Sequence, residues 1–169
     1  MAIVIEPYIP QSITVHLGPP DAPAENVTVS FPDYVKNVAS SEIYPTWEPA
    51  AIRANVLAII SFALNRVYTE FYPSRGYDFQ ITSSTAYDQK FIRGRNFFDS
   101  ISEVVDDIFD NYLRRKGALE PLAANVGSIK PLPRKMVFLL RYPRMSEGCG
   151  TIAKSFAGRD RPLSAQEKL

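Results

Sequence analysis

The chain has 169 residues, the length of one domain or of one domain with a tail. Its 19 basic and 18 acidic side chains give a net charge of +1, which argues against a general nucleic-acid binder because such a protein needs a basic face. With one cysteine and one histidine, the chain cannot form an internal disulfide or a cysteine- or histidine-rich metal site, so we expect no metal and no cofactor.

The chain shows no targeting or membrane signal that we recognise. Its start, MAIVIEPYIP, lacks a basic region and has only a short apolar run. The most apolar stretch, residues 56–64, is far shorter than the roughly 20 residues that cross a bilayer. We therefore expect no membrane span and, for the sequence as written, a cytoplasmic protein.

Charge and patterning divide the chain near Pro121. Residues 1–121 carry a net charge of −5 and show periodic patterns, whereas residues 122–169 carry +6 and contain scattered prolines. We predict a folded body over 1–121 and a basic, irregular segment over 122–169, with a short strand at residues 136–141. The basic segment is read as a solvated tail or as a tail that contacts an anionic polymer.

The N-terminal part of the body predicts two strands. Polar and apolar residues alternate over 12–18 and again over 26–31, which indicates a hairpin or a small antiparallel sheet. His16 falls on the polar side of the first strand, so we predict a surface histidine. A further short strand is expected around Phe79 and Ile81.

A helix is predicted over residues 32–43, and it brings a glutamate onto its apolar face. Glu42 follows Val38 by four residues and Val35 by seven, near the end of the helix. Burial and the negative end of the helix dipole both raise the pKa of a carboxyl group there, as a general acid requires. The alternative is that Glu42 only caps or hydrogen-bonds the following turn.

Two further helices complete the prediction. Thr46 is the expected N-cap of a long apolar helix over 47–72. An amphipathic helix is predicted over 100–116, with a capping box of Ser100 and Glu103, a solvated acidic face and Gly117 at its C-terminal end. The polar run before it, residues 82–89, suits either a sugar-binding loop or an ordinary loop. The fold class is therefore α+β, mostly helical with a small antiparallel N-terminal sheet.

Several motifs in this order resemble one protein family. The run FPDYVKNVASSEIYPTWEPAAIRANVLAIISFALNRVYTE resembles the core of the stage II sporulation protein D family, in which a helix ends in a Ser-Glu pair before a proline-bearing corner and a long helix. The later run TSSTAYDQKFIRGR is similar to that family's Ser-Thr, Gln and Gly block. The resemblance covers residues 7–121, and hence a partial copy of the family's domain.

The resemblance implies action on the glycan strands of peptidoglycan. The best-known members of the family are lytic transglycosylases, whose essential glutamate matches Glu42 as acid and then base, without a cofactor. We expect Tyr44, Trp47, Tyr87 and Gln89 to line the substrate groove. The resemblance implies spore or cell-wall association, and it allows association with other cell-wall or spore proteins.

Three departures from the family pattern leave other interpretations open. The order Trp47-Glu48-Pro49 inverts the expected one, the family's zinc-site residues are missing, and residues 145–153 only faintly match its C-terminal signature. The chain is therefore interpreted as a transglycosylase, as a glycan-binding module without catalysis, or as an inactive truncated remnant.

Overall fold

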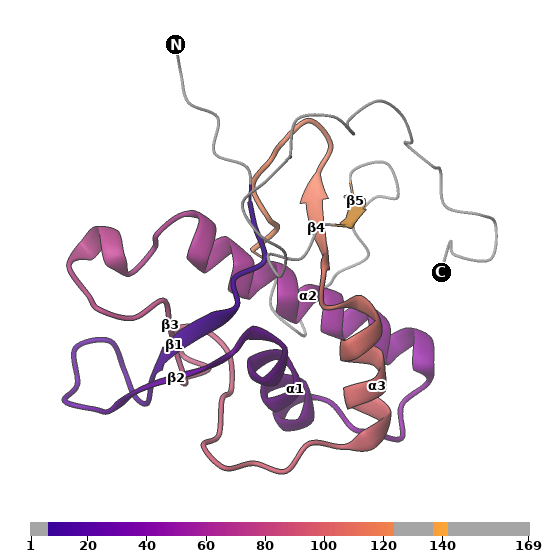
Figure 1. The fold of residues 1–169 in the computed structure, drawn as a ribbon, viewed down its shortest axis with the longest axis horizontal. Coiled ribbons are helices and arrows are strands. Elements are labelled where there is room, and N and C mark those ends of the chain that lie inside the picture. Colours follow the sequence, from indigo (N-terminus) through magenta and orange to yellow (C-terminus); the bar gives the residue numbers. More distant parts are fainter. Residues whose placement is uncertain (1–6, 124–136, 142–169) are drawn as a thin grey trace.

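The structure is a computed structural model, and it describes residues 7–123 and 137–141. The predicted signature at 145–153 and most of the basic segment lie outside the described residues. The helices and strands follow one another as β1 (Ser12–His16), β2 (Asn26–Ser30), α1 (Phe31–Glu42), α2 (Pro49–Tyr68), η1 (Pro73–Arg75), β3 (Ile81–Thr82), α3 (Asp99–Ile108), β4 (Asn111–Arg115) and β5 (Val137–Arg141). This arrangement confirms the predicted α+β class (Figure 1).

Two small sheets flank the helices. β1 pairs with β2 antiparallel, with Ser12 opposite Ser30, as the alternating pattern predicted. β3 then pairs with β1 in parallel, so the first sheet has the order β2-β1-β3 and is mixed rather than purely antiparallel. The second sheet joins β4 to β5 antiparallel, and it ties residues beyond the expected boundary at 121 to the folded body.

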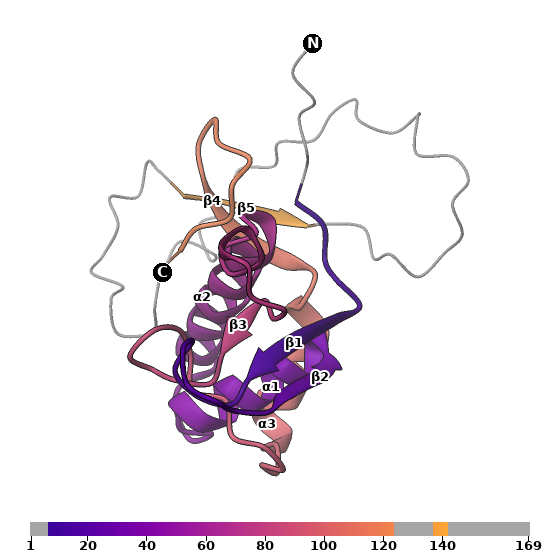
Figure 2. The same ribbon diagram turned by 90° about the vertical axis from the view of Figure 1, so that its left-hand side faces the viewer.

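α2 is the central helix of the molecule. α1 and α3 lie on one side of it and β4 and β5 on another (Figures 1 and 2). All residues from Ala58 to Asn65 are buried, so the neighbouring elements cover the most apolar part of the helix. α2 starts after Glu48 without a side-chain cap, so the prediction of Thr46 as N-cap is wrong.

By length and composition, the segment Pro49–Arg75 is apolar enough to cross a membrane, with a mean hydropathy of 1.4. In the fold, 56 % of the 18-residue apolar window is buried against the rest of the protein. A central core helix has this same composition, because it is covered on most of its circumference.

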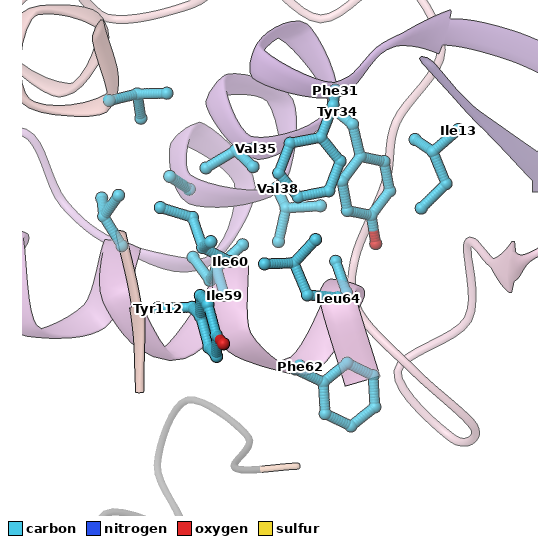
Figure 3. Close-up of a cluster of buried hydrophobic side chains, with 14 of the residues drawn as sticks. Ile13, Phe31, Tyr34, Val35, Val38, Ile59, Ile60, Phe62, Leu64 and Tyr112 are labelled. Atoms are coloured by element: carbon cyan, nitrogen blue, oxygen red, sulfur yellow. The ribbon is translucent and has the colours of Figure 1, made fainter. Parts of the chain in front are cut away.

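The core lies where α1 crosses α2. Figure 3 shows Phe31, Tyr34, Val35 and Val38 of α1 facing Ile59 of α2 and its neighbours. The helical spacing in the sequence anticipated these positions, and α1 forms within one residue of the predicted range. Ser30 caps the helix by accepting a hydrogen bond from the Asp33 backbone N–H at 3.2 Å, and Pro32 sits in the first turn, where its missing N–H costs nothing.

The predicted helix over 100–116 is wrong in its second half. α3 ends at Ile108, and residues 111–115 form strand β4 instead. The Asn111 side chain donates to the carbonyl of Ile108 at 3.3 Å, which helps to satisfy the helix end. The capping box is also absent, because Ser100 donates its hydroxyl to Pro45 and the N-cap position is Phe98. Asp110 is buried rather than solvated.

His16 is buried and not on the surface as predicted. Its ring stacks on Phe79 with the centroids 4.6 Å apart, and its two nitrogens lie 2.7 Å from Asn26 Oδ1 and 3.0 Å from the Ala22 carbonyl. The loop after β1 therefore covers the His16 end of the strand, whereas Ser12 on the same side of the strand is exposed.

Candidate functional site

Glu42 is the last residue of α1, and it is half-buried at the surface. Its Oε1 accepts a hydrogen bond from the backbone N–H of Lys90 at 2.8 Å. Burial raises the pKa of the Glu42 carboxyl above its ordinary value, and the Lys90 N–H and charge oppose part of that rise. The direction is the one that the sequence predicted, although the hydrogen bond to residue 90 was not foreseen.

The loop between β3 and α3 brings Lys90 to Glu42 by docking along α1. The Asn37 side chain binds the backbone of Ile92 twice, donating to its carbonyl at 2.8 Å and accepting from its N–H at 2.9 Å. The Tyr34 hydroxyl donates to Gln89 Oε1 at 3.0 Å, and the Gln89 amide donates to the Ile59 carbonyl at 3.3 Å. These bonds fix both sides of Lys90.

Asp88 anchors the same loop to the interior. Its buried carboxylate accepts from Arg66 at 2.7 Å, from the Tyr72 hydroxyl at 2.6 Å, and from both the N–H and the hydroxyl of Thr82 at 2.9 and 2.7 Å. The Arg66 guanidinium lies over the rings of two phenylalanines, so both charges are held in place. A buried carboxylate with four donors is fully satisfied, and we assign it a structural role.

Exposed aromatic side chains lie just after Glu42 in the α1–α2 connection. Tyr44 is 69 % exposed and Trp47 is 41 % exposed, with the ring centroids 6.0 Å apart and the planes tilted by 50°. Large aromatic surfaces left in water at this level are typical of binding sites rather than of a core. Tyr87, on the β3–α3 loop, is 51 % exposed, and its carbonyl accepts from Arg66 at 3.4 Å.

The structure brings several of the predicted site residues close to Glu42, but it gives Gln89 a different role from the one predicted. Tyr44 and Trp47 follow Glu42 directly, and Gln89 precedes the residue that binds Glu42. Gln89, however, is only 1 % exposed and has both ends of its amide engaged inside the protein. A direct sugar contact by Gln89 does not fit this geometry, because its polar atoms already have partners.

Sequence reasoning missed two residues that build the site. Asn37 is a buried polar residue on the otherwise apolar face of α1, three positions after Tyr34, and such a residue in a helical pattern signals a specific partner. Lys90 acts through its backbone N–H, which any residue other than proline provides, so its side chain gives no signal.

The described residues contain no group of three or more histidine, cysteine or acidic side chains arranged to hold a metal ion. Cys149 lies outside them. The Glu42 carboxyl group can give and take a proton, and the exposed rings that follow it can contact the face of a sugar.

A comparison of the chain with protein-family models finds no match, and a comparison with curated proteins finds no similar sequence. The likeness to the stage II sporulation protein D family therefore rests on the sequence motifs alone.

Proposed function

We propose that this protein acts on the glycan strands of peptidoglycan, cleaving them as a lytic transglycosylase with Glu42 as the only acid and base. The observation that carries the proposal is the half-buried Glu42 carboxyl with a raised pKa, set beside the exposed Tyr44 and Trp47. A general acid needs a pKa near the working pH, and a polymer substrate needs an open surface. On this proposal the protein acts at the cell or spore wall.

In the proposed reaction, protonated Glu42 gives its proton to the glycosidic oxygen as the bond from that oxygen to the anomeric carbon breaks. The Glu42 carboxylate then takes the proton of the same sugar's 6-hydroxyl, whose oxygen bonds to the anomeric carbon and closes a 1,6-anhydro ring. No water is consumed, and the enzyme ends in its starting protonation state. One carboxyl group suffices because the substrate supplies the nucleophile.

The neighbouring residues support this cycle in different ways. The Lys90 N–H stabilises the Glu42 carboxylate between the two proton transfers, since it donates only to the oxygen Oε1 and leaves the other oxygen for substrate. Tyr44, Trp47 and Tyr87 offer rings for the sugar faces. Gln89 positions the loop through Tyr34 and does not itself contact the glycan.

The test is incubation of the full chain with purified peptidoglycan sacculi, followed by mass spectrometry of the soluble products. Wild type is expected to release anhydro-muropeptides, and Glu42→Gln is expected to lose about 100-fold or more of that activity, the range for removal of a general acid. Gln keeps an oxygen that accepts from the Lys90 N–H, so folding is retained.

The control variant is Glu103→Gln, which removes an exposed carboxyl group from α3 and should keep full activity. Release of anhydro-muropeptides at the wild-type rate by Glu42→Gln would contradict the assignment of Glu42. Absence of any product from wild type would contradict the proposed reaction.

A second candidate function is a glycan-binding module without catalysis. The observation that favours it is the exposure of Tyr44 and Trp47, because rings at an open surface bind sugars whether or not an acid works beside them. In the same assay, this module predicts that wild type and Glu42→Gln are retained equally on sacculi and release no sugar. An inactive remnant predicts neither retention nor release.

A further inference from the structure

The segment that leads into α3 carries a second group of exposed aromatic side chains. Phe97 is 37 % exposed and Phe98 is 39 % exposed. The guanidinium of Arg95 lies over the Phe98 ring, with its central carbon 5.8 Å from the ring centroid. The Arg95 cation and the Phe98 ring are therefore presented together at the surface, next to Phe97 in the sequence.

This segment lies against the connection that carries Glu42 and the first pair of rings. The Phe98 N–H donates to Ser40 Oγ at 3.3 Å, two residues before Glu42. The Ser100 hydroxyl donates to the Pro45 carbonyl at 3.3 Å, one residue after Tyr44. In Figure 1 the β3–α3 loop reaches the start of α3 beside the α1–α2 connection. The segment that carries Arg95, Phe97 and Phe98 is therefore docked beside the connection that carries Glu42 and Tyr44.

The charge of Arg95 has no counter-ion among the residues that the structure describes. Its Nε is buried and has no hydrogen-bond partner there. Four other basic side chains of the body do pair with a carboxylate, namely Lys36, Arg53, Arg66 and Arg93. Packing on Phe98, rather than an acidic neighbour, holds the Arg95 guanidinium beside the rings, and its charge is left for an anion from outside.

We propose that Arg95, Phe97 and Phe98 form a subsite for an acidic sugar of the glycan strand that passes Glu42. The proposal rests on the proposed function and adds the residues that choose between acidic and neutral sugars. A sugar lying on the exposed rings brings a carboxylate carried by the same sugar within reach of Arg95. The guanidinium fork matches that carboxylate with two parallel hydrogen bonds.

The aromatic rings and the guanidinium charge together indicate which ligand the subsite takes. Rings alone bind the faces of neutral and acidic sugars alike, and a cation alone binds any anion. An aromatic pair next to an uncompensated guanidinium selects a ligand that has an apolar face and a carboxylate close together. N-acetylmuramic acid, with its lactyl group on the sugar ring, has both.

The test measures binding of two disaccharides by NMR titration of the full-length chain. One is N-acetylglucosamine linked to N-acetylmuramic acid, and the other is the neutral dimer of N-acetylglucosamine, so the pair differs by the lactyl group. Wild type is expected to bind the acidic disaccharide about tenfold more tightly, the effect of one charged hydrogen-bonded contact. Arg95→Gln should bring the two affinities together, and Phe98→Ala should weaken both.

Matched controls come from the opposite end of α2. Arg75 also lies over a phenylalanine ring, at 3.9 Å, so Arg75→Gln removes a similar cation away from the subsite. Tyr8 is 47 % exposed, and Tyr8→Ala removes an aromatic side chain of similar exposure. Both variants should keep the wild-type preference. Equal affinity of wild type for the two disaccharides, or an unchanged preference in Arg95→Gln, would overturn the subsite.

The outcomes separate this inference from the proposed function. If sacculi are cleaved through Glu42 while Arg95→Gln keeps its preference, the subsite fails and the function stands. If Arg95→Gln loses the preference while Glu42→Gln releases as much product as wild type, the subsite stands and the catalytic assignment fails.

Discussion

Two carboxyl groups held by the same loop differ in almost every respect. Asp88 lies in the interior and accepts four hydrogen bonds, one of them from the Arg66 guanidinium. Glu42 lies at the surface and accepts one hydrogen bond, from the Lys90 N–H, and the pKa of its carboxyl group is raised by burial. Asp88 itself lies on the loop, only two positions before Lys90, the residue whose N–H binds Glu42.

The difference shows how one loop serves both stability and chemistry. The four hydrogen bonds to the Asp88 carboxylate join α2, the segment after it and β3 to the loop, so this carboxylate holds the loop in place. A carboxylate with a single donor keeps an oxygen for substrate. The inner part of the loop, at Asp88, is therefore expected to govern the stability of the fold. The outer part, residues 90–92, is expected to govern proton transfer at Glu42.

The largest expected effect on stability comes from Asp88→Asn. The change leaves the partly buried Arg66 cation, whose side chain is 15 % exposed, without its partner, and removal of one member of a buried ion pair costs about 3–5 kcal/mol. Chemical denaturation measures the free energy of unfolding. Asp107→Asn serves as the control, because its pair with Arg53 is exposed and such pairs contribute roughly 0–1 kcal/mol. If both variants lowered the free energy of unfolding equally, the interior ion pair would contribute no more to stability than the exposed one.

Asn37→Ala tests the docking of the outer part of the loop. It removes both hydrogen bonds to the Ile92 backbone, with an expected loss of about 1–3 kcal/mol in the free energy of unfolding. It should also raise the pKa of Glu42 further, because the Lys90 N–H that lowers it is no longer held in place. Asn96→Ala, at an exposed position on the same loop, should change neither quantity.

Tyr34→Phe is expected to have a smaller effect. It removes the hydroxyl that donates to Gln89 and costs about 1 kcal/mol by denaturation, because the buried amide oxygen of Gln89 loses its donor. Tyr87→Phe removes an exposed hydroxyl on the same loop and should leave stability unchanged. If the two variants were equally stable, the contact between Tyr34 and Gln89 would not hold the loop.

Glu42→Gln should have the smallest effect on stability, and the effect should depend on pH. Because the pKa of Glu42 is raised in the folded protein, the folded state binds its proton more tightly than the unfolded state does. Wild type therefore loses stability relative to Glu42→Gln as the pH rises from below 4.5 through the raised pKa. Urea unfolding between about pH 4 and about pH 7 measures this difference. If the stability of wild type relative to Glu42→Gln stayed constant or increased as the pH rises, the result would contradict a raised pKa.

The parts of the fold that are determined by residues close together in the sequence could be predicted. The spacing from Phe31 to Glu42 predicted α1, and the alternation in β1 and β2 predicted their pairing. The predicted strand at 136–141 is confirmed as Val137–Arg141.

The predictions were wrong where contacts between residues far apart in the sequence determine the secondary structure or the burial. Tyr112 and Leu113 continue the apolar spacing of α3, but β4 pairs with β5, more than 20 residues further along the chain, and its strand conformation overrides that local pattern. His16 looked exposed because its burial depends on Phe79 and on the loop after β1. Burial of the Glu42 side chain followed from helical spacing, whereas the Lys90 N–H came from a loop with no regular pattern.

The most direct test of the difference between the two carboxyl groups is a 13C NMR titration of the Glu42 side chain. Its carboxyl signal is assigned by its absence in Glu42→Gln. We predict that Glu42 titrates with a midpoint above the ordinary glutamate value of 4.5, since burial outweighs the single hydrogen bond. A midpoint at or below 4.5 would mean that Glu42 is held as a carboxylate, and it would contradict the role of Glu42 as a general acid.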